Sequence, residues 1–178
     1  MRILVLGIGN ILFGDEGIGV HLCNLLKLNY TLQGPHTVEF VDGGTMAATL
    51  IPIIIEYDRV LLLDCVSVVG AEVGAVYYFD FDKVPEMITW AGSAHEVEML
   101  QTLKLTELLG DLPPVKIIGI IPEVIGEETA FRLSEKVKKG AILAEELAIQ
   151  FLSELGMQAQ KTDNRDLQDI ADFSFRGY

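Results

Sequence analysis

Short apolar runs alternate with longer amphipathic stretches along the chain, and this alternation predicts an α/β layered fold. Five runs have the length and composition of strands: Ile3–Gly7, Val38–Val41, Val60–Leu63, Val73–Phe79 and Val115–Ile121. Four stretches have helical spacing: Gly17–Tyr30, Met46–Tyr57 with an interruption at Pro52, Ser93–Leu109 and Glu135–Leu155. The pattern leaves the direction of the fourth strand open.

Capping signals mark two of the helix starts. Ser93 and Glu96 have the spacing of a capping box, and Ser134 is expected to cap the last helix, which should end at Gly156. The residues that follow are mostly polar. We therefore expect one α/β domain over residues 1–156 and a loosely held polar tail over residues 157–178.

Composition narrows the class of protein. The chain has 178 residues, 50% of them hydrophobic, which is enough to bury a sizeable core. Its formal net charge of −13 argues against binding to nucleic acid or anionic lipid. No apolar run approaches the roughly 18 residues of a membrane span. Cys23 and Cys65 are too few for a disulfide framework. We expect a soluble, cytoplasmic protein without membrane insertion.

Chemistry-bearing side chains gather at one end of the predicted sheet. In open α/β sheets, ligands bind beyond the carboxyl ends of the strands. The first strand leads to Asp15 and Glu16, the second to Asp42 and the third to Asp64, while a later helix brings His95 to the same end. The sequence therefore predicts four acids and one imidazole at a single edge.

Each of these residues has a structural alternative. Asp15 is expected to cap the helix that follows it, whereas capping explains a second acid, Glu16, less readily. Asp64 follows four apolar residues, so its carboxylate should be partly desolvated and needs a cation or N–H donors. His95 lies in a first helical turn, which favours the neutral imidazole that metals bind, although a lone histidine more commonly packs in a loop. Glu16, Asp64 and His95 form a candidate three-ligand site for Zn²⁺ or Ni²⁺.

Other chemistries fit less well. A dinucleotide-binding glycine motif fails because Leu12 occupies the place of its third glycine, and Asp15 and Glu16 would repel a pyrophosphate. Cys65 could act as a nucleophile with His95 as its base, but a buried thiol is the commoner role. A nucleotide-binding α/β module and a non-catalytic nickel or zinc carrier stay open as alternatives to an enzyme.

Five segments, in order, carry a resemblance to a known family. They are MRILVLGIGNILFGDEGIGV, Asp42-Gly43-Gly44-Thr45, Asp64, Ser93-Ala94-His95-Glu96 and the stretch from Gly119 to Glu123. Over about residues 1–156 the chain resembles the nickel–iron hydrogenase maturation proteases. The resemblance implies a three-layer α/β/α sandwich with a five-stranded, mixed, mostly parallel sheet in the order 2-1-3-5-4, the fourth strand being antiparallel.

The resemblance also implies an activity. The family's endopeptidases, which are hydrolases, remove a C-terminal extension from the nickel-loaded, immature large subunit of a [NiFe] hydrogenase. By resemblance, Glu16, Asp64 and His95 are both metal-binding and catalytic residues, and Asp42, Gly43 and Gly44 recognise the substrate. Nickel is then supplied by the substrate and no resident organic cofactor is expected. Whether the mechanism is of the aspartyl type or metal-dependent stays open.

Overall fold

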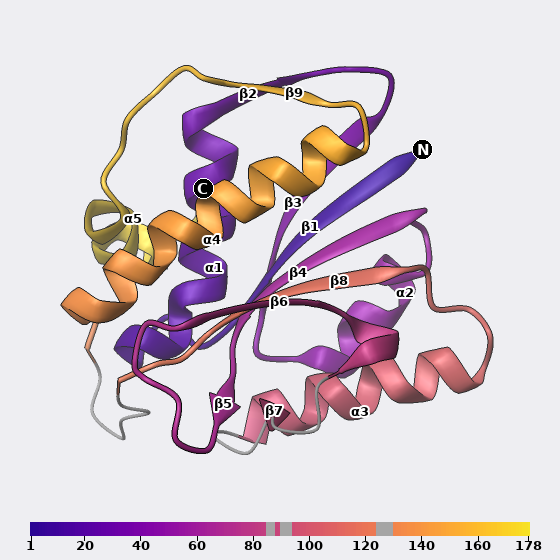
Figure 1. Cartoon of the computed structure of the whole chain (residues 1–178), viewed down its shortest axis with the longest axis horizontal. Helices are drawn as coiled ribbons and strands as arrows, with labels where there is room; N and C mark the ends of the chain where they lie inside the picture. Colours follow the sequence, from indigo (N-terminus) through magenta and orange to yellow (C-terminus); the bar gives the residue numbers. More distant parts are fainter. Residues whose placement is uncertain (85–87, 90–93, 124–129) are drawn as a thin grey trace.

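A five-stranded sheet forms the centre of the molecule, in the order β3-β1-β4-β8-β6 (Figure 1). The computed structural model describes residues 1–84, 88–89, 94–123 and 130–178, and side chains 47, 48, 89 and 94–98 lie outside that description. The strands are β1 (Arg2–Ile8), β3 (Thr37–Gly44), β4 (Arg59–Cys65), β6 (Val76–Asp80) and β8 (Val115–Ile120). β6 pairs antiparallel with β8, and the other pairs are parallel. The expected order and direction of all five strands are confirmed.

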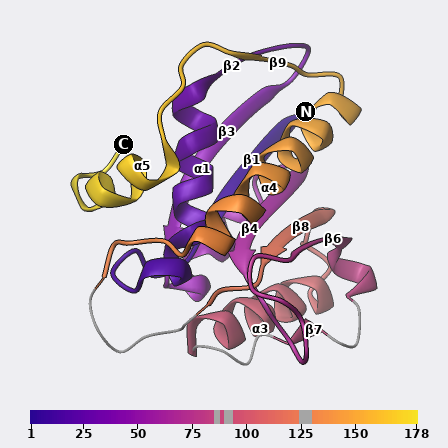
Figure 2. The same ribbon diagram turned by 60° about the vertical axis from the view of Figure 1, so that its left-hand side comes forward.

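Helices cover both faces of this sheet. They are α1 (Ile18–Asn29), α2 (Ile51–Ile54), α3 (Ala94–Leu108), α4 (Glu135–Glu154) and α5 (Leu167–Phe173). α1 and α4 lie on one face and α2 and α3 on the other, which confirms the three-layer sandwich (Figures 1 and 2). None of the helices in the described ranges has both the length and the apolar character needed to cross a membrane.

The central strands are buried on both faces, as their unbroken apolar runs predict. In β1, Ile3 and Val5 pack into the core beneath α1 and α4, whereas Leu4 and Leu6 pack into the core above α2 and α3. In β4, Leu61 packs into the first of these cores and Leu62 into the second. This two-sided burial fixes the sheet between its helical layers and fixes the positions of the loops that leave its ends.

Shorter elements complete the chain. The 3-10 turns are η1 (Gly14–Gly17), η2 (Ala47–Leu50), η3 (Phe81–Lys83) and η4 (Ser174–Arg176). Two antiparallel ribbons pair β5 (Ser67–Val68) with β7 (Ile88–Thr89), and β2 (Tyr30–Gln33) with β9 (Gln158–Lys161). The interrupted helix expected over Met46–Tyr57 is confirmed as η2 followed by α2.

The capping predictions have different outcomes. Ser134 caps α4, because its Oγ accepts a hydrogen bond from the backbone N–H of Val137 (3.3 Å). The helix ends before Gly156, whose φ of +82° suits glycine. Ser93 lies outside the described residues, as does the side chain of Glu96, so the second capping box stays a prediction.

The C-terminal segment differs from the loosely held tail that we expected. β9 pairs with β2, and α5 buries Leu167, Ile170 and Ala171 in the core shared with α1 and α4 (Figure 1). Asp166 caps α5, since its Oδ1 accepts the backbone N–H of Gln168 (2.8 Å). The expectation of a loose tail is wrong because three apolar residues at helical spacing are enough to anchor a mostly polar segment.

Candidate functional site

Three parallel strands deliver acidic residues to the same edge of the sheet. β1 lies between β3 and β4, and Gly7 of β1 is opposite both Asp42 of β3 and Leu63 of β4. Asp42 and Asp64 therefore flank the end of β1, from which the chain continues into η1. The strand order reverses direction at this point, which is where α/β sheets bind ligands.

Glu16 lies in η1, and its side chain is buried, with 4% exposure. η1 packs against β4, the strand that carries Asp64. Gly9 makes this close packing possible, because a Cβ at its position would overlap the carbonyl oxygen of Glu16 and its φ is +145°. The backbone thus brings the turn that carries Glu16 down onto the end of the sheet.

Asp64 is the next-to-last residue of β4 and is 2% exposed. Its Oδ1 accepts the backbone N–H of Cys65 (2.8 Å). In the sheet it lies opposite Gly119 of β8. The expected burial of Asp64 is confirmed, and a buried carboxylate at the end of a central strand is a strong candidate for binding a cation.

Asp42 has a different environment, because its side chain is exposed. Its Oδ1 accepts the backbone N–H of Gly44 (2.9 Å), and Gly44 has a φ of +55°, so the carboxylate stabilises a tight turn. The N–H of Gly9 in turn donates to the carbonyl of Gly44 (3.0 Å). A Cβ on Gly43 would crowd the side chain of Ile8. The Asp42-Gly43-Gly44 turn is therefore attached directly to the loop that leads to Glu16.

His95 is the second residue of α3, but its side chain lies outside the described residues. Among the described side chains, no group of three or more His, Cys, Asp and Glu residues could hold a metal ion. The structure thus brings the elements that carry Glu16 and Asp64 to one edge, and the three-ligand set with His95 stays a prediction.

Asp15 does not cap the helix that follows it, as we had expected. Within residues 14–29, neither η1 nor α1 has a hydrogen bond from a side-chain cap. The carboxylate instead accepts the backbone N–H groups of Ser134 (Oδ1, 2.8 Å) and Glu123 (Oδ2, 2.9 Å). Local sequence could not indicate these partners, because they are 119 and 108 residues away.

His21 is a buried residue that our sequence interpretation left without a role. It is fully buried on α1, and neither ring nitrogen has a hydrogen-bond partner within the described part of the chain. Burial lowers the pKa of His21 to about 4, so the imidazole is neutral near pH 7. A Cβ on Gly17 would lie 2.6 Å from its Nε2, so the ring packs beneath the end of η1. In the sequence, the spacing of four residues between Gly17 and His21 was the only indication that the ring could lie against the turn before α1.

Cys23 has the core role expected of it. It is fully buried, its Sγ donates to the carbonyl of Val5 (3.4 Å), and burial raises the pKa of its thiol to about 12. Cys65 is buried as well. These environments favour packing over nucleophilic chemistry.

Comparison with known proteins agrees with the fold and identifies the family. A family model described as hydrogenase maturation protease (HycI) matches residues 20–151. Protein HydD of Wolinella succinogenes is 53% identical over 159 residues, which cover 89% of this chain and 100% of HydD. The hydrogenase 2 maturation protease of Escherichia coli K12 is 32% identical over 160 residues, covering 89% of this chain and 95% of that protein.

A solved structure extends the similarity to the whole fold. The hydrogenase maturating endopeptidase HybD from E. coli superposes with a TM-score of 0.78 at 28% identity, covering 91% of this chain and 98% of that one. The chain therefore belongs to the hydrogenase maturation protease family, a family of peptidases.

Proposed function

We propose that this protein is an endopeptidase that removes the C-terminal extension of the nickel-loaded large-subunit precursor of a [NiFe] hydrogenase. Membership of the family supports a peptidase, and the names of its relatives point to hydrogenase maturation. The observation that carries the proposal is the burial of two carboxylates, Glu16 and Asp64, on neighbouring elements at the switch point of the sheet.

In this proposal Glu16, Asp64 and His95 bind the nickel ion that the precursor brings. Carboxylate oxygens and a neutral imidazole are suitable ligands for a divalent transition metal. Two buried carboxylates near one edge also favour a cation, because a nearby positive charge offsets the cost of burying negative charge. The ion is part of the substrate, so the protein supplies only the groups that complete its coordination.

Catalysis then depends on how these groups place the scissile peptide. A divalent ion polarises a carbonyl oxygen and lowers the pKa of a bound water. Glu16 or Asp64, held by the fold beside that water, accepts its proton as the peptide bond is attacked. Asp42, which is exposed at the turn formed with Gly43 and Gly44, contacts the precursor next to the nickel.

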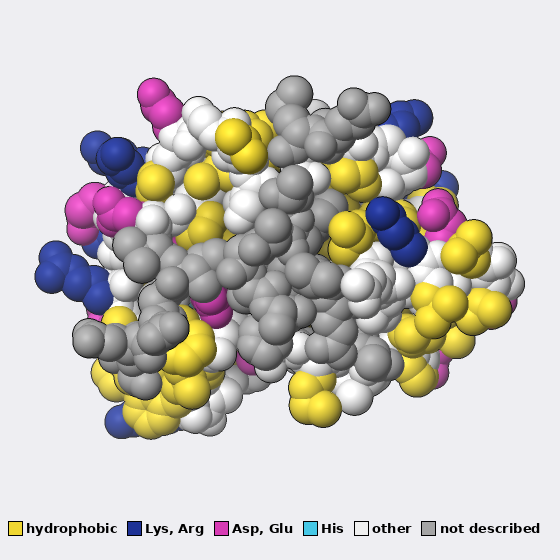
Figure 3. Space-filling view, turned by 90° about the horizontal axis from the view of Figure 1, so that it is seen from below, with side chains coloured by type: hydrophobic (Ala, Val, Ile, Leu, Met, Phe, Trp, Pro, Cys, Tyr) yellow, Lys and Arg dark blue, Asp and Glu magenta, His cyan; other side chains and the backbone are white. Residues whose placement is uncertain are grey.

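A protein substrate also needs a surface around the site. Seen from below, apolar side chains gather at both ends of the molecule (Figure 3). Phe173 and Phe175, at the end of α5 and just after it, are both exposed. Phe175 contacts the ring of Phe131, whose neighbour Ala130 bonds to the loop before Glu16. Exposed apolar surface near a site is typical of proteins that bind another protein.

The test is cleavage of a purified, nickel-loaded precursor, measured by mass spectrometry. Glu16→Gln, Asp64→Asn and His95→Ala should each slow cleavage on the order of 100-fold or more, because each removes a ligand and two remove a candidate base. Glu39→Gln, an isosteric change at the opposite edge of the sheet, is the matched control and should cleave normally. Wild-type rates in all three site variants would contradict the proposal. A wild-type protein that binds nickel but leaves the precursor at full length would instead be a carrier.

A further inference from the structure

Asp15 is a buried carboxylate whose hydrogen bonds connect three segments that are distant in sequence. It is 5% exposed, in η1. Its Oδ2 accepts the N–H of Glu123, just after β8, and its Oδ1 accepts the N–H of Ser134, the N-cap residue of α4. One side chain thus ties the turn after β1 to the segment after β8 and to the start of α4.

Backbone contacts beside Asp15 strengthen this connection. The N–H of Gly14 donates to the carbonyl of Ala130 (2.6 Å), and the N–H of Ala130 donates to the carbonyl of Leu12 (2.8 Å). Gly14 has a φ of +54°, and a Cβ there would lie 3.1 Å from the carbonyl oxygen of Arg132. Residues 130–134 therefore run closely along the loop that leads into Glu16.

These contacts define what the carboxylate contributes. Hydrogen bonds from N–H groups to an ionised acceptor are roughly twice as strong as neutral ones. Each Asp15 oxygen holds one of them, so the side chain is fixed at two points on separate elements. Glu16 is the next residue along the chain. Fixing Asp15 therefore restrains the backbone that sets the direction of the Glu16 side chain.

We propose that Asp15 is a positioning residue for precursor cleavage: it anchors η1 to the Glu123 and Ser134 backbone so that Glu16 is presented to the nickel in a fixed geometry. This inference rests on the proposed function, because it takes Glu16 as a ligand. In this proposal Asp15 acts through Glu16 and not on the ion or the substrate, because each of its oxygens is directed at a backbone N–H group.

Asp15→Asn is the sharpest variant, because it keeps the shape of the side chain. An amide offers a single acceptor oxygen and turns an N–H₂ group toward the second backbone N–H. We expect kcat for cleavage of the nickel-loaded precursor to fall about 10- to 100-fold while KM is unchanged, since misplacement of a catalytic group by about 1 Å has an effect of this size. Asp15→Ala loses both acceptor oxygens, so its kcat should be lower than that of Asp15→Asn.

Asp166→Asn is the matched control. Asp166 also holds a backbone N–H, that of Gln168, but in the cap of α5. The same isosteric change there should leave kcat and KM at wild-type values. Thermal unfolding of each variant, with assays run well below every midpoint, separates positioning from loss of folded protein.

A second pair of variants changes Ser134, the residue whose N–H bonds to Asp15. These variants test the same contact if Asp15→Asn does not fold. Ser134 has a φ of −66°, which proline adopts without strain. Ser134→Pro removes the N–H that Asp15 accepts and places a ring carbon toward that oxygen. Ser134→Ala keeps the N–H and removes only the Oγ cap of α4. We expect Ser134→Pro to lower kcat and Ser134→Ala to retain it.

The outcomes separate this inference from the function on which it rests. A lower kcat with unchanged KM in Asp15→Asn, and a normal Asp166→Asn, supports it. Wild-type kcat in Asp15→Asn or in Ser134→Pro, with Glu16→Gln inactive, overturns the positioning role and leaves the proposed function in place. A change confined to KM also overturns it, because that change indicates docking. Normal cleavage by Glu16→Gln overturns both.

Discussion

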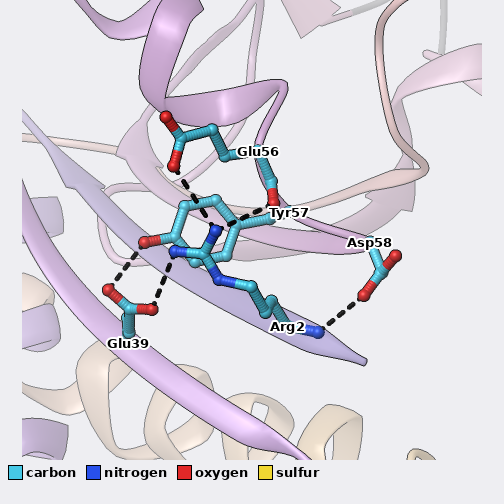
Figure 4. Close-up of polar contacts among 5 residues, drawn as sticks. All are labelled: Arg2, Glu39, Glu56, Tyr57 and Asp58. Atoms are coloured by element: carbon cyan, nitrogen blue, oxygen red, sulfur yellow. Dashed lines mark hydrogen bonds and ion pairs between the residues drawn. The ribbon is translucent and has the colours of Figure 1, made fainter.

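The two ends of the central sheet hold their acidic residues in opposite ways. At the amino end, Glu56 is exposed, Glu39 is half-buried, and both pair with Arg2 (Figure 4). At the carboxyl end, Asp15, Glu16 and Asp64 are each no more than 5% exposed. The buried acids lie in η1 and at the end of β4, whereas the more exposed ones lie near the start of β3 and just before β4.

The amino-end cluster stabilises a surface. The Arg2 guanidinium bonds to Glu39 (3.1 Å) and to Glu56 (3.4 Å), and it lies 4.5 Å from the centre of the Tyr57 ring. The Tyr57 hydroxyl donates to Glu39 (2.8 Å), and this bond, together with Arg2, lowers the pKa of the Glu39 carboxyl. Asp58 accepts the backbone N–H of Arg2 (Figure 4). The charged side chains of Arg2, Glu39 and Glu56 keep much of their contact with water, so their pairing requires little desolvation.

At the carboxyl end, by contrast, the acidic side chains of η1 and of the end of β4 are buried. Burying a carboxylate opposes folding unless donors or cations compensate for it. Asp15 is held by two backbone N–H groups. Glu16 and Asp64 lie beside it on one turn and one strand end, and we interpret this concentration of buried acids as a region shaped for binding rather than for stability.

Gly19→Ala should have the largest effect, because the carboxyl end depends on close backbone approach. A Cβ at Gly19 would overlap the carbonyl oxygens of Ile8 and Leu63, which are backbone atoms with little freedom to move. We expect a loss of about 3 kcal/mol in the free energy of unfolding, at the upper end for overpacked sites, measured by urea denaturation. At Gly110 an added Cβ meets no described atom within 4 Å, and the φ of +82° alone should cost about 1–2 kcal/mol. Equal losses would show that the close packing at Gly19 is not required.

His21 should give this end of the molecule a pH-dependent stability. Its pKa is about 4 in the folded protein and 6.5 ordinarily, so the unfolded chain binds more protons between these values. Stability is then highest above pH 6.5 and falls as the pH drops toward 4, by at most about 3 kcal/mol. The nearby charge of Asp172 works slightly in the other direction. Unfolding measured across this range should show a flatter profile for His21→Leu than for wild type, whereas parallel profiles would refute the assignment.

Tyr57→Phe should have the smallest effect and should be confined to the amino end. Loss of the hydroxyl removes the largest influence that lowers the pKa of Glu39, so that pKa should rise, as NMR titration of the carboxyl carbon would show. Stability should change by no more than about 1 kcal/mol. Precursor cleavage should be unchanged. Slower cleavage by a stably folded Tyr57→Phe protein would mean that the two ends are not functionally separate.

The sequence was most informative where local patterns carry the physics. Unbroken apolar runs predict buried central strands, and an acid directly after such a run, as with Asp64, is expected to be buried too. The gathering of acids at one edge was predictable because each acid follows the carboxyl end of a predicted strand. Ser134 was identifiable as a cap because its acceptor role involves a residue only three positions away.

The misinterpreted features depend on contacts between distant residues. The partners of Asp15 lie more than a hundred positions away, so its neighbours suggested a local cap. α5 has only a few apolar residues, and it is held because α1 and α4 provide a surface for Ile170. β2 and β9 are short, polar strands that are stable as a pair. None of these contacts has a signature within a single window of sequence.

We propose that Glu16, Asp64 and His95 together bind the nickel of the precursor. Crystals of the protease bound to a nickel-loaded precursor, with data collected on both sides of the nickel absorption edge, would test it directly. We expect an anomalous peak bonded to a carboxylate oxygen of Glu16, a carboxylate oxygen of Asp64 and a ring nitrogen of His95. A nickel peak that contacts none of these three side chains would contradict it.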